Sequence, residues 1–316
     1  MAEKVIIDTD PGIDDAMAIF FAFQSPDLDV LGLTTTFGNV PVSMATRNAL
    51  TLCEIAGKDI PVCEGVKLPW VGPESTYAHF VHGDDGFGNI NHPTSTADPD
   101  PRSAAQFIID MAKKYPGEVT LVAIGPLGNL AMALKMAPEI STLLKGVVIM
   151  GGAAQVPGNV TPVAEANIWN DPYAADIAFS AQWPFTMIGL DVTYAVSYTQ
   201  DFLAKMAQVN PKLGGFVQKA AQFYVQFYSS VFQSTDQEVC YFHDAMALAY
   251  VIDPTLFEVK EGYFRVATDP LCYGQTTFAP LDKMIAPQWE GRPKMGAALS
   301  VDKARLTQLF LDTYAL

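Results

Sequence analysis

Four aspartates lie within eight residues near the start of the chain, at positions 8, 10, 14 and 15. Carboxylates this close repel one another unless a positive charge or hydrogen-bond donors lie nearby. Structural roles explain two of them, since Asp15 could cap the following helix and Asp8 could accept a bond from a loop amide. Pro11-Gly12 forces a turn that can bring Asp10 and the Asp14-Asp15 pair together. Clustered carboxylate oxygens suit Ca²⁺ or Mg²⁺, so the segment predicts a cation site, with a purely structural cluster as the alternative.

Two other metal-dependent motifs begin in a similar way. An EF-hand loop starting at Asp8 would need glycine and glutamate where this chain has Ile13 and Ile19. The start Asp8-Thr9-Asp10 also fits the nucleophile loop of Mg²⁺-dependent haloacid-dehalogenase-type phosphatases, with Asp8 as the nucleophile. Those enzymes carry a later pair of adjacent acids after a strand, whereas Asp253 and Asp302 each stand alone. The phosphatase is nevertheless the nearest alternative function.

Short apolar runs alternate with helical patterns along the chain, which predicts strands joined by helices. Such alternation implies crossover connections, so we expect one α/β domain over residues 1–316, with a mainly parallel, Rossmann-like central sheet flanked by helices. The predicted strands are Val5–Ile7, Val30–Thr36, Val119–Ile124, Val147–Met150 and Phe185–Leu190. The predicted helices include Ala16–Phe23, 43–56 with Ser43 as cap and Gly57 at its end, Leu130–Met136, one starting at Asp171-Pro172, Leu203–Gln208, Phe216–Val231, Ala245–Val251 and one from Asp302 to about Tyr314.

Ligands of such sheets bind beyond the carboxyl ends of the strands, and further polar residues lie at those positions. Asn39 follows the second predicted strand, and by itself it is more typical of a turn. Asn159, Glu165 and Asn167 follow the Val147–Met150 strand. Amides and one acid can hydrogen-bond several sugar hydroxyls, although an ordinary polar loop has the same composition. A long segment from about Val66 to Pro101 is predicted to be a functional or mobile loop.

The pattern Asp-x-Asp-Pro-Gly-x-Asp-Asp-Ala after the first strand resembles the motif of the inosine–uridine-preferring nucleoside hydrolases. Further similar segments extend to about residue 254: His82-Gly83-Asp84-Asp85-Gly86, the run Gly158 to Asn167, and His243-Asp244. The resemblance implies an enzyme that hydrolyses the N-glycosidic bond of ribonucleosides, giving free nucleobase and ribose. It also implies that the nucleophile is a Ca²⁺-bound water activated by Asp10.

The resemblance also implies roles for individual residues. The Ca²⁺ ligands would be Asp10, Asp15, Asp244 and the main-chain carbonyl of Ile124. Asp10 would be the catalytic base, and His243 would protonate or steer the leaving base. The expected substrate contacts are Asp14, Asn39, His82, Asn159, Glu165 and Asn167. Tyr224 and Tyr228, at i,i+4 spacing on a predicted helix, could stack on a nucleobase or pack within the protein. Ile124, Gly128, Ala166 and Ala245 differ from the residues common in relatives.

Composition limits the partners and the cellular location. The formal net charge of −15 disfavours binding to nucleic acids and anionic membranes. The sequence has no run of eighteen apolar residues, so we expect no membrane span. The N-terminus lacks a signal-peptide pattern and the four cysteines are scattered, so we expect reduced thiols in the cytoplasm.

The expected partner is a small ribonucleoside, and the resemblance implies a homodimer or homotetramer. A metal-dependent ribose- or nucleoside-binding protein without enzymatic activity is the second alternative. Preference for purine or pyrimidine bases stays open.

Overall fold

The computed structural model describes residues 2–72, 75–232, 238–281 and 287–316. Within these residues, the centre is a nine-stranded sheet in the order β10-β9-β11-β6-β5-β4-β1-β2-β3. Neighbouring strands from β11 to β3 run parallel, whereas β9 is antiparallel to both β10 and β11. The strands are β1 (Glu3–Thr9), β2 (Leu28–Thr35), β3 (Val62–Glu64), β4 (Val119–Ala123), β5 (Gly146–Met150), β6 (Phe185–Ile188), β9 (Phe257–Val266), β10 (Thr276–Pro280) and β11 (Met295–Val301). A separate small sheet pairs β7 (Tyr198–Thr199) with β8 (Val239–Cys240).

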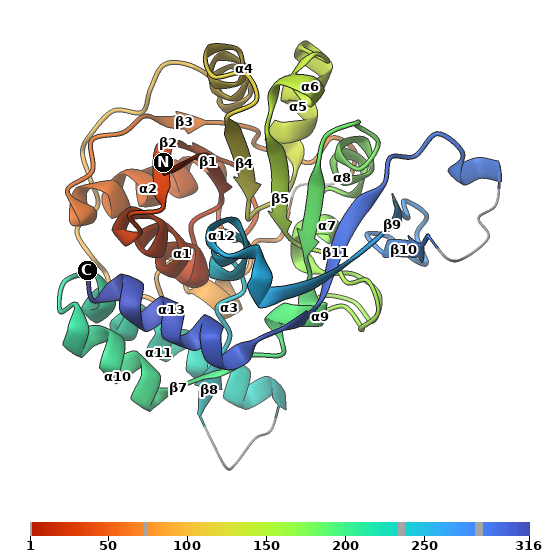
Figure 1. The fold of residues 1–316 in the computed structure, drawn as a ribbon. Helices are drawn as coiled ribbons and strands as arrows, with labels where there is room; N and C mark the ends of the chain where they lie inside the picture. Colours follow the sequence, from red (N-terminus) through yellow and green to blue (C-terminus); the bar gives the residue numbers. More distant parts are fainter. Residues whose placement is uncertain (1, 73–74, 233–237, 282–286) are drawn as a thin grey trace.

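Helices cover both faces of the sheet, as Figure 1 shows. Successive side chains of a strand point to opposite faces, so Val5 and Ile7 of β1 join one core cluster while Ile6 joins the other. Burial on both faces explains why these strands are continuous apolar runs in the sequence. The first cluster involves α1 (Ile13–Gln24), α2 (Val42–Ala56), α10 (Gln200–Val209), α11 (Leu213–Phe232), α12 (Ala245–Ile252) and α13 (Lys303–Tyr314). The second involves α4 (Ala104–Lys114), α5 (Gly128–Met136), α6 (Ile140–Leu143) and α8 (Pro172–Ala178).

The predicted α/β fold with a mainly parallel sheet is therefore confirmed, and each predicted strand overlaps β1, β2, β4, β5 or β6, although three of them were predicted to end one or two residues too late. The strands β9, β10 and β11 were not predicted. β9 is exposed over residues 258–261, so it has no apolar run to mark it. The remaining short elements are α3 (His79–His82), α7 (Ala166–Asn170), α9 (Leu190–Thr193) and the 3₁₀ turns Pro254–Leu256 and Pro287–Trp289.

Several helix ends follow the predicted capping. The Asp171 carboxylate accepts the amide of Ala174 at the start of α8, and Asp302 accepts the amide of Arg305 at the start of α13. Gly57 ends α2 with a left-handed φ of 67°. The prediction that Ser43 caps α2 is wrong. The helix begins at Val42, one residue before Ser43, and its N-cap position is Pro41, which forms no side-chain capping bond.

The C-terminal helix supports the first helix from behind. The Tyr314 hydroxyl donates to the Met17 carbonyl at 2.9 Å, and the Phe310 ring meets Phe21 edge-on at 4.9 Å. Since α1 carries Asp14 and Asp15, contacts made by the last residues help to fix the acidic segment.

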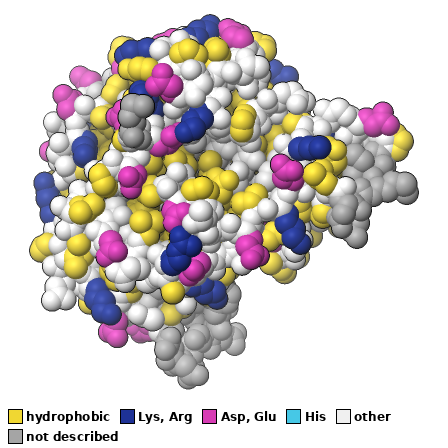
Figure 2. Space-filling model, viewed as in Figure 1, with side chains coloured by type: hydrophobic (Ala, Val, Ile, Leu, Met, Phe, Trp, Pro, Cys, Tyr) yellow, Lys and Arg dark blue, Asp and Glu magenta, His cyan; other side chains and the backbone are white. Residues whose placement is uncertain are grey.

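The surface and the cysteines bear on the remaining expectations. On the face in Figure 2, acidic and basic side chains are interspersed instead of forming one patch of a single sign. Across the described ranges, no helix is both long and apolar enough to span a membrane. The cysteines Cys53, Cys63, Cys240 and Cys272 are free thiols.

Removing the cap of α13 should cost stability. Asp302→Ala leaves the amide of Arg305 without its acceptor, so the free energy of unfolding should fall by about 1 kcal/mol. Asp302→Asn keeps an acceptor and should lose less. Urea unfolding of both variants measures the difference. An alanine variant as stable as the parent would contradict the capping role.

Candidate active site

A cavity of about 380 Å³ opens at the carboxyl ends of the parallel strands. Its wall comes from the segments that follow β1, β2, β4, β5 and β6, together with α3, α11 and the start of α12. This volume suits a small ligand. Among the described residues, no lysine or arginine lines it. The predicted site residues in the wall are Asp14, Asn39, His82, Ile124, Asn159, Glu165, Asn167, Tyr224, Tyr228, His243 and Asp244.

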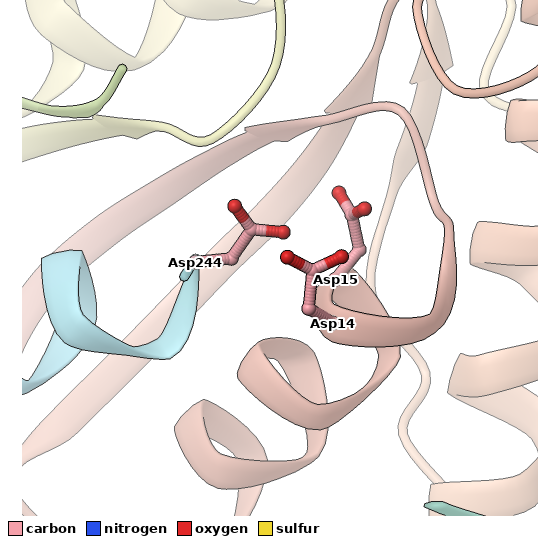
Figure 3. Close-up of side chains that lie close together, drawn as sticks. All are labelled: Asp14, Asp15 and Asp244. Atoms are coloured by element: carbon pink, nitrogen blue, oxygen red, sulfur yellow. The ribbon is translucent and has the colours of Figure 1, made fainter. Parts of the chain in front are cut away.

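Three carboxylates meet beside this cavity. Asp14 and Asp15 come from the first turn of α1 and Asp244 from the residue before α12, and Figure 3 shows them pointing toward one another. One oxygen from each lies within 4.8 Å of the others. Asp244 occupies the cap position of α12, but its carboxylate makes no capping bond, which leaves it directed at the other two acids. This oxygen-only group could hold a hard cation.

Asp10 lies beside this group, although the sequence prediction named it as a ligand and Asp14 as a substrate contact. Its Oδ2 accepts the amide of Asn39 at 2.6 Å, and its Oδ1 is buried without a hydrogen-bond partner. Glycines flank the carboxylate on both sides. A Cβ atom at Gly38 would lie 2.0 Å from Oδ2, and one at Gly125 would lie 2.5 Å from Oδ1. Only glycine therefore lets these two loops approach Asp10 so closely.

Asp15 is not the N-cap residue of α1, which was the structural alternative to its predicted role as a ligand. The helix begins at Ile13, so Asp15 is its third residue and its carboxylate reaches back toward the preceding turn. Oδ1 accepts the Thr9 hydroxyl and the Asp10 amide, while Oδ2 accepts the Gly12 amide at 2.9 Å and the Asn39 side-chain amide at 3.0 Å. These donors hold the Asp15 carboxylate against the turn and oppose the rise in its pKa that burial causes.

Burial raises the pKa of all four acids, and neighbouring carboxylates raise that of Asp10, Asp14 and Asp244 further. Burial is the main cause for Asp10 and Asp244, whose pKa values are well above the usual range, and their acidic neighbours raise them further. Burial raises the pKa of Asp14 to about 8, assisted by the charge of Asp15. Asp14 also has a buried Oδ1 without a partner. Partnerless carboxylate oxygens in an acidic cluster fit a site for a cation, which would favour ionisation of all four acids.

The amide-rich segment forms one wall mostly through backbone contacts. Glu165 caps α7, since its Oε2 accepts the amides of Gly152 and Ile168 and its Oε1 accepts that of Asn167. The Asn167 side-chain amide donates to the carbonyls of Ile124 and Met150, both at 3.0 Å. Asn159 accepts the amide of Ala166. Glu165 and Asn167 thus position the loops after β4 and β5 as well as lining the cavity.

The opposite wall is aromatic. Tyr224 donates to Oδ2 of Asp14 at 3.3 Å, Tyr228 donates to the Tyr224 hydroxyl at 3.3 Å, and the Tyr228 hydroxyl lies 2.8 Å from Nε2 of His243. These two tyrosines therefore do more than pack within the protein, because their hydroxyl groups link His243 to the acidic cluster. Burial lowers the pKa of His243 to about 3, which favours the neutral form of the ring.

His82 ends the short helix α3 instead of lying in an open loop. Its Nδ1 accepts the amide of Ile13 at 3.1 Å, which places the imidazole against the start of α1. Its ring centroid lies 5.5 Å from that of Tyr224, and burial lowers the pKa of His82 to about 3. His82 is thus a neutral residue of the aromatic wall.

Two neighbouring residues were missed in the sequence, Tyr194 in this wall and Thr193 buried behind it. Tyr194 lines the cavity, and its hydroxyl bonds the side chains of Tyr228 and Asn159. Thr193 Oγ1 lies 2.7 Å from Nδ1 of His243. The one available signal was that both follow a predicted strand. The mouth of the cavity is apolar, with Phe80 70% and Val231 53% exposed beside Val160 and Phe227.

Two other acids lie outside the cavity wall. Asp8 is buried behind it, and its Oδ1 accepts the Thr34 hydroxyl and the Asn129 side-chain amide. A phosphatase nucleophile must face its substrate, so this position does not support the phosphatase alternative. Asp191 accepts the amides of Ala154 and Gln155, both at 2.8 Å, which fixes the loop after β5.

Comparisons with known proteins agree on one family. The sequence model of the inosine-uridine preferring nucleoside hydrolases matches residues 5–308. A probable uridine nucleosidase 2 of Arabidopsis thaliana is 42% identical, over 98% of this chain and 97% of that protein. Among solved structures, a plant nucleoside hydrolase superimposes with a TM-score of 0.95 and 40% identity, covering 100% of this chain and 99% of that one. A purine-preferring ribonucleoside hydrolase from Gardnerella vaginalis superimposes with a TM-score of 0.91 and is 34% identical. The match covers 99% of this chain and 98% of that one.

Without a cation, the protein should lose stability as the pH rises from 6.5 to 8. Burial raises the pKa of Asp8 to about 7 and that of Asp14 to about 8, so the folded state binds more protons here than the unfolded chain. The neutral His82 and His243 act in the opposite direction, but only below their unfolded pKa near 6.5.

Added Ca²⁺ should reduce this loss by favouring the ionised acids. Melting temperatures at both pH values, with a chelator and with Ca²⁺, measure the effect. Equal stability of the chelated protein at both pH values, unchanged by Ca²⁺, would contradict a cation site.

Proposed function

This chain belongs to the inosine–uridine-preferring nucleoside hydrolase family, and we propose that its cavity binds and hydrolyses ribonucleosides with Asp10 as the catalytic base. Family membership supports hydrolysis of the N-glycosidic bond, which makes the protein an N-glycosyl hydrolase. One observation carries the proposal. Segments around residues 10–15, 159–167 and 243–244, distant in the sequence, surround one cavity with an acidic end and an aromatic end.

The acidic end is where we propose that the ribose binds. Cleavage of a glycosidic bond develops positive charge on the sugar, in an oxocarbenium-like transition state. Fixed carboxylates and amides from Asp14, Asn39, Asn159, Glu165 and Asn167 suit such a sugar, because they accept bonds from its hydroxyls and favour its developing charge. The absence of lysine and arginine among the described lining residues is consistent with this electrostatic demand.

We propose Ca²⁺ as the cation held at this end. Asp15 and Asp244 belong both to the set implied by the family resemblance and to the close carboxylate trio. The resemblance also implies Asp10 and the Ile124 carbonyl as ligands, whereas the third member of the close carboxylate trio is Asp14. When bound, the ion supplies a site for the ribose diol and for water, whose pKa it lowers.

Asp10 is suited to accept the proton of the attacking water. Its Oδ2 is held by the Asn39 amide, which fixes the carboxylate, while Oδ1 has no hydrogen-bond partner in the protein. Burial raises the pKa of Asp10, which makes it a stronger base than an exposed aspartate once it is ionised. Attack by water on the sugar face opposite the leaving base predicts inversion at the anomeric carbon.

The nucleobase would then lie toward the aromatic end. There the Tyr228 hydroxyl joins His243 and Tyr224, so polar hydrogens of this group lie where a nitrogen of the departing base could accept a hydrogen bond. The apolar mouth offers contact surface with few hydrogen-bonding groups, which favours fit to the shape of the base over recognition of its edges. A panel of inosine, adenosine, guanosine, uridine and cytidine distinguishes purine from pyrimidine preference.

The proposed assembly follows from the resemblance, and the proposed location from the N-terminal pattern and the scattered cysteines. We propose a homodimer or homotetramer that acts in cytoplasmic nucleoside salvage. Light scattering of the purified protein measures the oligomeric state.

Asp10→Asn should remove the base and keep the fold. The asparagine oxygen can still accept the Asn39 amide, but the side chain cannot take a proton, so kcat for inosine and uridine should fall about 10²–10⁴-fold. Reducing-sugar release measures turnover. Asp29→Asn, at an exposed position of β2, is the matched control and should keep full activity. Normal turnover by the Asp10 variant would remove it from the mechanism, and binding without turnover by the parent would favour the binding-protein alternative.

His243→Ala should impair nucleosides more than an activated substrate. A p-nitrophenyl riboside has a good leaving group that needs no proton, so its kcat should fall much less than that of inosine or uridine. The ratio of the two losses is the relevant measurement. Equal losses on both substrates would argue against leaving-group assistance.

A further inference from the structure

His243 is held between two hydroxyl groups on opposite edges of its ring. Nδ1 lies 2.7 Å from Thr193 Oγ1, and Nε2 lies 2.8 Å from the Tyr228 hydroxyl. Thr193 ends α9, is fully buried and does not line the cavity, so it cannot touch the substrate. Its backbone amide bonds the carbonyl of Gly189, and β-branching limits its side-chain rotation. The hydroxyl of Thr193 is therefore a fixed point behind the histidine.

The directions of the hydrogen bonds follow from the acid at the other end of the chain. The Tyr224 hydroxyl donates to Oδ2 of Asp14, and the Tyr228 hydroxyl donates to that of Tyr224. Each hydroxyl has one proton, so Tyr228 must accept from His243, and Nε2 carries the hydrogen. In the neutral ring Nδ1 is then an acceptor, and its donor is the Thr193 hydroxyl.

Ring packing alone does not select this arrangement. Tyr194 meets the imidazole edge-on at 5.0 Å and Tyr241 stacks on it at 6.0 Å, which fixes the plane of the ring. A half-turn about the Cβ–Cγ bond keeps that plane but exchanges both nitrogens for carbons. Among the described residues, the hydroxyl groups of Thr193 and Tyr228 oppose this half-turn, because each bonds one of the ring nitrogens.

We propose that Thr193 is a positioning residue, whose hydroxyl holds Nδ1 of His243 so that the Nε2 proton faces Tyr228 and the aromatic end of the cavity. The inference rests on the proposed function, in which this end assists departure of the base. Thr193 would act only through His243, so its loss should affect poor leaving groups more than good ones.

Thr193→Val removes the hydroxyl at nearly constant volume, and Thr193→Ser keeps it. For the valine variant we expect kcat for inosine and uridine to fall about 10- to 100-fold, with a much smaller loss for p-nitrophenyl riboside. The serine variant should recover most of the activity. Thr120→Val is the matched control, since it removes a buried hydroxyl that bonds Glu3 at the opposite end of the sheet, and it should leave the ratio of the two substrates unchanged.

¹⁵N NMR reports the tautomer of the His243 ring directly. The chain has only four histidines, so the ¹⁵N signals of His243 can be assigned by substitution. The parent and the serine variant should show the Nε2–H tautomer, and the valine variant should show loss of that single form. An unchanged His243 spectrum in the valine variant, or equal losses on nucleosides and aryl riboside, would overturn the inference. If the parent released no ribose from any nucleoside, the proposed function would fail, while the spectra would still test the contact.

Discussion

Repulsion among buried carboxylates is the constraint on which the site depends. Asp10, Asp14, Asp15 and Asp244 are withdrawn from water at the carboxyl ends of the strands, where the charges of Asp10, Asp14 and Asp15 raise the pKa of Asp244. Such an arrangement is costly unless donors and a cation offset it. The chain supplies part of the compensation through Thr9, Asn39 and backbone amides around Asp15. The remaining oxygens without partners are those best placed to face an ion.

The two ends of the cavity are built by different means. At the acidic end, most side chains are fixed by main-chain groups, as Glu165 is by three amides. At the aromatic end, side chains fix one another through hydroxyl contacts that join α9, α11 and the segment before α12. Tyr194 connects the two ends, because its hydroxyl reaches both Asn159 and Tyr228. A substrate whose sugar and base meet different chemistry suits this division.

Much of the sheet and of the acidic end could be predicted from the sequence, because the signals there are local. Val5–Ile7 is a buried apolar run, and the four aspartates follow it within a few residues. The role of Asp14 was harder to predict, since its distance from Asp244 depends on how two helices approach. Thr193 carries no pattern of its own and acquires a role only through contact with His243, fifty positions away. β9 was missed because an exposed strand near the sheet edge needs no continuous apolar run.

The support of α1 by Tyr314 constrains how the protein can be made. The side chain that bonds Met17 is synthesised 297 positions after Met17 itself. β11 likewise inserts between β6 and β9 only after both exist. The contact that supports α1 from behind can therefore form only after the strands and helices between residues 17 and 314 have been synthesised.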